Sequence, residues 1–134
     1  MLVVGGKGAK NKKTELIDLS KPFTHCVLPD FPFGMAGAIG FTSGEWPLVC
    51  GGAGSNGDSI KCFILKGFGS NYEWKEWINM TAPRTFASAF TISFDQTLII
   101  GGGNVTTRSH SVDNLDNYKR YVNKNGLRKL NRRH

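Results

Sequence analysis

The sequence predicts an all-β protein built from repeated antiparallel β-sheets, and two observations carry that prediction. Short apolar runs ending in a glycine pair occur three times, and the first glycines stand at positions 5, 51 and 101, at intervals of 46 and 50 residues. Self-similarity at such a period is typical of repeat architectures in which each repeat forms one supersecondary unit. The body of the chain shows no sustained helical periodicity, and its turn signals recur at the short spacing that an array of strands requires.

The first expected strand of each repeat is the run that ends at the glycine pair, over 2–4, 47–50 and 98–100. A second strand-like run follows in each repeat, over 14–19, 59–65 and 111–115. The intervening turns are rich in Gly, Asn, Ser and Lys, over 7–13, 53–58 and 104–110. Because these residue types favour turns, each repeat is expected to contain a β-hairpin.

The middle repeat continues with an aromatic segment around Trp74, followed by Met80 and Arg84, and a run of small residues leads into the third glycine pair. In the first repeat, Phe23 is expected to take the place of Trp74. Ala38 then aligns with Ala89, because each aromatic lies fifteen residues before its alanine. This alignment predicts four short strands in each repeat.

The glycine pair, the aromatic third strand and the Trp, Met and Arg spacing resemble the kelch repeat, whose unit is one four-stranded blade of a β-propeller. The resemblance is specific in the middle repeat, partial in the first and confined to the start of the third, and it covers about residues 2–115. It implies a partial blade over 2–33, the most complete blade over 34–83 and a partial blade over 84–115, within a segment spanning 1–115. The composition of 116–134 predicts a basic tail that is disordered or weakly helical. The residues that it marks as structural are Gly5, Gly6, Gly51, Gly52, Gly101, Gly102, Trp74, Met80 and Arg84.

A closed propeller needs at least about four blades, whereas this resemblance accounts for about two and a half. We therefore expect an incomplete, open array, either a piece of a larger propeller or a chain that self-associates through its open blade edges.

The net charge of +7 is confined to the tail. Residues 1–118 carry ten basic and ten acidic side chains, whereas 119–134 carry seven basic side chains and no acid. The tail can be read as a basic arm that binds nucleic acid or as a solvated end, and we favour the solvated end because the change in composition falls abruptly inside a repeat. No membrane segment is expected, because no apolar run approaches the roughly 20 residues of a membrane span.

No cofactor, metal or catalytic site is expected. The segment from Gly52 to Gly57 matches the dinucleotide pattern G-x-G-x-x-G, but the strand-like run at 59–65 follows it where that motif requires a helix. Turn geometry explains these glycines, and we interpret the segment as a hairpin loop. The cysteines contain no C-x-x-C motif, the histidines are isolated, and no nucleophile has a recognisable base.

Cys50 and Cys62 fall on neighbouring strands of the middle hairpin, so they are either a cross-strand disulfide or two small buried hydrophobic residues. Cys26 is either the odd cysteine or a competitor for Cys50. Asn79 and Asn104 fit the N-glycosylation pattern. Cytoplasmic and extracellular compartments both fit the sequence, and the cysteines and glycosylation triplets tilt the expectation toward the extracellular one.

The resemblance implies a non-enzymatic scaffold that holds a protein partner on the loops between its strands. The candidate partner-contacting residues are Lys7, Lys10, Asn11, Ser55, Asn56, Asp58, Asn104 and Arg108. Two alternatives stay open. One is a fragment of a kelch-fold enzyme of the galactose-oxidase or sialic-acid-epimerase type, and the other is a nucleic-acid-binding protein that acts through its basic tail.

Overall fold

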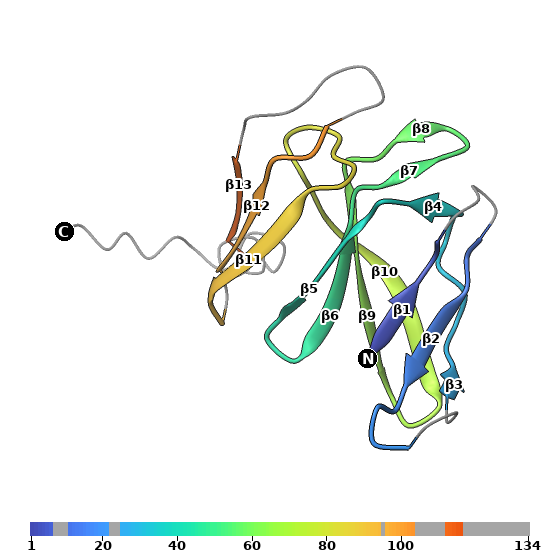
Figure 1. The fold of residues 1–134 in the computed structure, drawn as a ribbon. Coiled ribbons are helices and arrows are strands. Elements are labelled where there is room, and N and C mark those ends of the chain that lie inside the picture. Colours follow the sequence, from blue (N-terminus) through green and yellow to red (C-terminus); the bar gives the residue numbers. More distant parts are fainter. Residues whose placement is uncertain (7–10, 22–24, 95, 104–111, 117–134) are drawn as a thin grey trace.

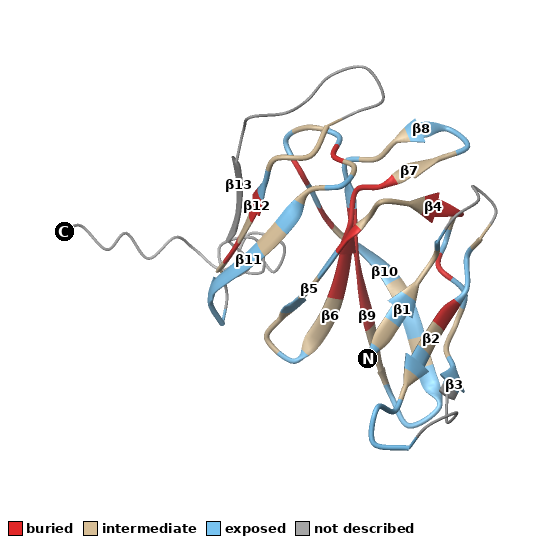
Figure 2. Cartoon of the chain, viewed as in Figure 1, coloured by how far each residue is buried: buried red, intermediate tan, exposed pale blue. Residues whose placement is uncertain are grey.

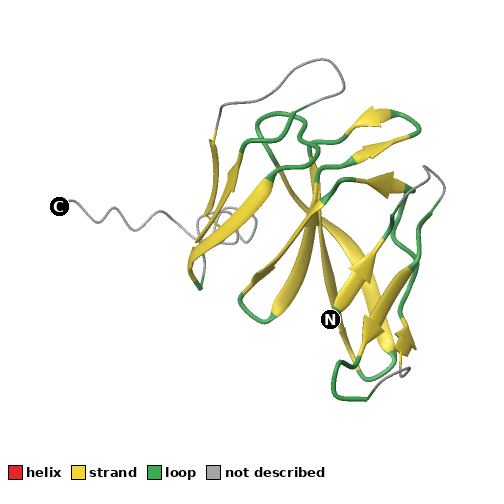
Figure 3. Ribbon diagram, in the orientation of Figure 1, coloured by secondary structure: helices red, strands yellow, loops and turns green. Residues whose placement is uncertain are grey.

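The computed structural model describes residues 1–6, 11–21, 25–94, 96–103 and 112–116. These residues form antiparallel strands joined by turns, and no helix occurs among them (Figure 3). The all-β prediction is confirmed.

The strands form three main sheets that follow one another along the chain (Figure 1). The first sheet contains β1 (Leu2–Val4), β2 (Thr14–Ile17) and β3 (His25–Val27). The second sheet contains β5 (Ile39–Ser43), β6 (Trp46–Cys50), β9 (Lys61–Phe68) and β10 (Asn71–Asn79). The third sheet contains β11 (Ser88–Ser93), β12 (Gln96–Ile100) and β13 (Val112–Asp116). A fourth, small sheet combines β4 (Met35–Ala36), β7 (Ala53–Gly54) and β8 (Gly57–Asp58).

The second sheet lies between the other two and is covered on both faces in its centre (Figure 2). Successive residues of a strand point to opposite faces. Accordingly, Val49 of β6 packs with Phe31 and, from the first sheet, Val4. Its neighbour Cys50 packs in a separate cluster with Ile99 of the third sheet. The described residues therefore form two thin cores, one at each junction between neighbouring sheets.

The glycine pairs stand where β1, β6 and β12 end, as the sequence predicts. All six glycines have the positive φ that favours glycine: Gly5, Gly6, Gly51, Gly52, Gly101 and Gly102. A Cβ atom on Gly51 would collide with the carbonyl oxygen of Arg84, and the N–H of Gly52 donates to that same oxygen at 2.8 Å. The pair thus brings the backbone of one repeat against the start of the next.

The structure corrects the predicted alignment of the small residues. Ile39 pairs with Cys50, and Ser88 pairs with Ile100, directly before the second and third glycine pairs. Ala38 therefore corresponds to Ala87, and the alignment of Ala38 with Ala89 is wrong by two residues. A slip of two residues keeps every side chain on the same face of a strand, so the alternation of alanines could not detect it.

Phe23 lies outside the described residues, so its expected likeness to Trp74 concerns a position that the structure does not describe. The strand register itself puts a different residue at that place. Gly5 and Gly51 donate their N–H groups to the carbonyls of Lys13 and Lys61, which makes those two lysines equivalent. Counting from them, His25 lies opposite Ile17 as Trp74 lies opposite Leu65.

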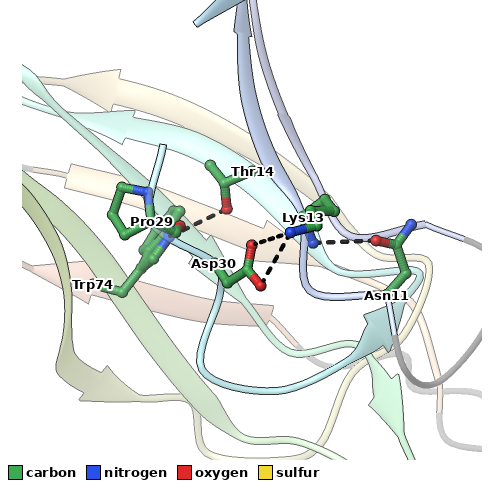
Figure 4. Close-up of polar contacts among 6 residues, drawn as sticks. All are labelled: Asn11, Lys13, Thr14, Pro29, Asp30 and Trp74. Atoms are coloured by element: carbon green, nitrogen blue, oxygen red, sulfur yellow. Dashed lines mark hydrogen bonds and ion pairs between the residues drawn. The ribbon is translucent and has the colours of Figure 1, made fainter. Parts of the chain in front are cut away.

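Trp74 joins the first and second repeats (Figure 4). Its indole Nε1 donates to Thr14 Oγ1 at 3.3 Å and to the Pro29 carbonyl at 3.2 Å, and its ring meets Phe31 edge to face at 4.9 Å. Thr14 is completely buried, and Trp and Thr side chains at such sites need polar partners. This contact fixes the position of the second sheet against the first.

Candidate interaction face

The ends of β1, β6 and β12 lie at the same end of the array (Figure 1). There a continuous series of contacts crosses all three repeats. A Cβ atom on Gly5 would lie 2.8 Å from the Met35 carbonyl oxygen, and Met35 pairs with Gly54 of β7. On the other side of the hairpin, Thr85 Oγ1 donates to Asp58 at 3.0 Å, and Thr85 also forms a β-bridge with Gly103. We call the surface made by residues 5–6, 53–58 and 101–103 the loop face.

The most prominent part of the loop face is the hairpin formed by β7 and β8. The sequence predicted a simple turn over 53–58, and the structure adds two short strands, of which β7 pairs with β4 and β8 pairs with β7. Ser55 and Asn56 lie exposed at its tip, whereas Ala53, Gly54 and Asp58 are half-buried. The tip therefore offers a hydroxyl and a carboxamide to solvent from a paired base.

The base of this hairpin is fixed by several bonds. Cys50 and Cys62 form a disulfide across β6 and β9, with Cα atoms 4.0 Å apart, and both are completely buried. Next to it, Ser59 N–H donates to the Gly52 carbonyl at 2.9 Å. Of the two readings that the sequence left open, the structure has the disulfide, and Cys26 is an exposed free cysteine.

The predicted partner-contacting residues divide into two kinds in the structure. Asn11 uses both ends of its amide within its own turn, since Nδ2 donates to the Gly5 carbonyl at 3.1 Å and Oδ1 accepts from Lys13 N–H at 3.1 Å. Asp58 likewise accepts a hydrogen bond from Thr85 within the protein. Both therefore shape the loop face, whereas Ser55 and Asn56 are presented by it. The remaining four, Lys7, Lys10, Asn104 and Arg108, lie outside the described residues.

Arg84 lies entirely beneath the loop face. Its side chain is 0% exposed, and Nη1 donates to the Gly101 carbonyl at 2.6 Å. A buried guanidinium needs such acceptors to offset its lost hydration. Met80 is also buried, and its N–H donates to the Ile60 carbonyl at 2.8 Å. The Arg84 side chain and the Met80 backbone thus bond to the segments beneath the loop face.

Sequence reasoning missed Thr85, which connects the second and third repeats through Asp58 and Gly103. The two bonded side chains are separated by 27 residues, and neither stands in a recognised motif. Phe86 was also missed. Among the described residues, Phe86 is the one non-glycine residue with a positive φ, which is 57°. Only its alignment with Gly37 could have suggested this backbone conformation.

Other predicted sites can be placed directly. The G-x-G-x-x-G pattern spans the β7–β8 hairpin, and β9 follows it. Asn79 is exposed at the end of β10, and Asn104 lies outside the described residues. Within the described ranges, no group of three or more His, Cys, Asp or Glu side chains is placed to hold a metal ion. The same part of the chain has no helix long and apolar enough to cross a membrane.

Comparison with known proteins gives a likeness of fold. No protein-family model matches the chain, and no curated protein matches it. Among 86 matching chains of solved structures is one described as a novel fungal alcohol oxidase of the AA5 family in complex with copper. The TM-score is 0.67 at 14% sequence identity, and the match covers 84% of this chain and 27% of the oxidase chain. The chain thus spans about a quarter of the oxidase's length, and it has the fold of an open, partial β-propeller of antiparallel sheets.

Proposed function

We propose that this chain is a kelch-type propeller segment that works as a non-enzymatic scaffold and holds a protein partner on its loop face. The observation that carries the proposal is the β7–β8 hairpin, in which an exposed polar tip stands on a base fixed by a disulfide and by β4. Recognition loops on rigid scaffolds have this arrangement, because a fixed base reduces the entropy lost when the loop binds.

The compartment that we propose is extracellular. The Cys50–Cys62 disulfide supports this, because such bonds form and persist in oxidising environments. The exposed Asn79 of the Asn-Met-Thr triplet is compatible with glycosylation there.

The enzyme alternative has less support among the described residues. The oxidase that shares the fold is described in complex with copper, and a metal centre requires several ligands placed together. The described part of this chain brings no such group together, so we derive no metal chemistry from it.

A matched pair of variants tests the scaffold proposal. Ser55 and Asn56 lie exposed before β9 begins, and Ser70 and Asn71 lie exposed at the turn after it ends, at the opposite end of that strand. The full chain is first used to select binders from a displayed library of extracellular protein domains. Each binder is then titrated against S55A/N56A and against S70A/N71A.

We expect S55A/N56A to weaken binding by about tenfold, as the loss of one or two interfacial hydrogen bonds would. S70A/N71A should bind as the unaltered chain does. If the binders lose affinity equally with both variants, or with S70A/N71A alone, the loop face is not the binding surface and the proposal fails.

A further inference from the structure

The third sheet has an apolar face that points away from the rest of the protein. Phe90, Ile92 and Ile100 are 66%, 54% and 46% exposed. The opposite face of the same strands is covered, because Ala89 and Ile99 pack against the second sheet. The third sheet therefore has apolar side chains on both faces, and among the described residues only one of those faces is packed against another sheet.

The strand register identifies this outward face. Phe41 pairs with Leu48 in the second sheet, and Phe90 pairs with Leu98 in the third. By the same register, Ile100 stands where Cys50 stands. The equivalent side chains Leu48 and Cys50 are buried, and Phe41 and Cys50 belong to the core between the second and third sheets. The outward face of the third sheet thus repeats the positions by which the second sheet binds its neighbour.

Gly101 has the same backbone conformation as the two glycines that contact the start of the following repeat. Gly5 and Gly51 have φ values of 68° and 69° and lie against the carbonyl oxygens of Met35 and Arg84. Gly101 has nearly the same φ, 71°, and no described atom lies within 4 Å of its Cβ position. Among the described residues, this third contact point is open.

The first sheet, at the other end of the array, has the surface that would face a preceding sheet. Val3 pairs with Glu15 and Glu15 with Val27, so these three side chains share one face of the first sheet. Val3 and Val27 are exposed on that face, at 37% and 72%. Val3 stands where Val49 and Ile99 stand in the later repeats, and both of those residues pack toward the preceding sheet.

The described array therefore carries, on its first and third sheets, the two halves of a junction that it forms twice internally. We propose that the outward face of the third sheet docks on the outward face of the first sheet in a second copy of this chain, head to tail. Two such junctions join two copies into a closed ring of six main sheets, within the range of about four to eight blades that propellers have. This proposal rests on the propeller-type fold and is independent of what the loop face binds.

Two variants of the full chain test the docking. Phe90→Lys places a charge on the third-sheet face, and Val27→Lys places one on the first-sheet face, both at exposed positions that tolerate a polar residue in the monomer. The matched controls are Phe68→Lys at the end of β9 and Leu19→Lys in the turn after β2, which alter exposed apolar residues outside the sets that define the two faces. Mass is measured by sedimentation over a range of protein concentrations, and circular dichroism checks that each variant is folded.

We expect the unaltered chain and both controls to sediment as dimers, and each face variant alone to sediment as a monomer. An equimolar mixture of the two face variants should recover a dimer, because one copy keeps an intact first sheet and the other an intact third sheet. Its dissociation constant should be higher than that of the unaltered chain, since one junction replaces two.

The alternatives give different results. Face-to-face pairing of two third sheets would leave Val27→Lys dimeric, and open-ended polymers of the unaltered chain would exclude the closed ring. A monomeric unaltered chain would overturn the proposal completely. None of these outcomes would affect the test with S55A/N56A, so the two proposals fail separately.

Discussion

Arg84 donates from Nη1 to the carbonyl oxygen of Gly101 at 2.6 Å, so a completely buried guanidinium holds the third glycine pair. The backbone carbonyl of Arg84 at the same time accepts the N–H of Gly52. One residue thus connects the second and third repeats through both its side chain and its backbone.

Replacement of Arg84 by Met should lower the free energy of unfolding by about 1–3 kcal/mol, because the half-buried Gly101 carbonyl loses this donor. Met is the informative substitution because Met35 is the equivalent residue of the preceding repeat. The carbonyl of Met35 accepts the N–H of Gly6, just as the carbonyl of Arg84 accepts the N–H of Gly52. Urea titration measures the change. Lys75→Met, at an exposed position, should stay within about 0.5 kcal/mol of the unaltered protein, and equal effects of the two variants would contradict the role of Arg84.

The disulfide should stabilise the protein by about 3 kcal/mol, the value expected for closing a loop of this length in the unfolded chain. Urea unfolding with and without reductant measures this contribution. Thiol titration of the unfolded, oxidised protein should find one thiol, from Cys26, and reduction should raise the count to three. Three reactive thiols before reduction would contradict the pairing.

The first repeat suggests how the disulfide could be replaced. Val4 lies opposite Thr14 just as Cys50 lies opposite Cys62, each pair directly beside a glycine pair. Cys50→Val/Cys62→Thr should therefore lose less stability than Cys50→Ser/Cys62→Ser, which buries two hydroxyls in an apolar core. The order of their unfolding midpoints in reductant decides the point, and the reverse order would count against the equivalence.

Phe86 should be a site of backbone strain. Its φ is 57°, its side chain is 81% exposed, and the equivalent residue of the second repeat is Gly37 with φ 67°. Phe86→Gly removes a left-handed penalty of about 1–2 kcal/mol and adds an entropic cost of about 0.5–1 kcal/mol, so the melting temperature should rise slightly. Phe86→Val should lower it, because β-branched residues fit this region poorly. A valine variant that melts with the unaltered protein would show that the strain is absent.

The hydrogen bond between Trp74 and Thr14 can be measured by a double-mutant cycle. Trp74→Phe and Thr14→Val each remove one partner, and the coupling free energy should be about 0.5–1.5 kcal/mol in favour of the intact pair. The indole N–H also donates to the Pro29 carbonyl. A coupling near zero would mean that Pro29 alone satisfies the indole.

The glycine pairs made the outline of the fold predictable, because only glycine readily takes the positive φ at which three strands end against another backbone. The aromatic and small residues predicted four strands in each repeat, which is right for the second sheet, whereas the first and third sheets have three described strands each. They did not predict the alignment of the strands. Ala38 and Ala89 look equivalent, yet Ala87 is the true partner, since alternation repeats every two residues and tolerates that error. The small sheet of β4, β7 and β8 escaped detection because two-residue strands have no measurable periodicity.

The candidate site was only partly predictable for a related reason. The hairpin at 53–58 could be predicted from its turn residues. That Ser55 is exposed while Asp58 is hydrogen-bonded could not, because the partner of Asp58 is Thr85, far away in the sequence. Asn11 likewise looked available until its amide proved to bond Gly5 and Lys13. Whether a polar side chain is available to a partner depends on its tertiary neighbours, and the local sequence does not identify those neighbours.

Adjacent residues Val49 and Cys50 face different cores, and this has a kinetic consequence. The buried residues of β6 and β9, 48–50 and 62–65, reach water only after a neighbouring sheet detaches, whereas the first and third sheets each have a face with exposed side chains. Amide protons should therefore exchange fastest at the two ends of the array and slowest in its centre, where exchange needs the largest opening. A molecule that held both terminal sheets would slow exchange in the centre without touching it.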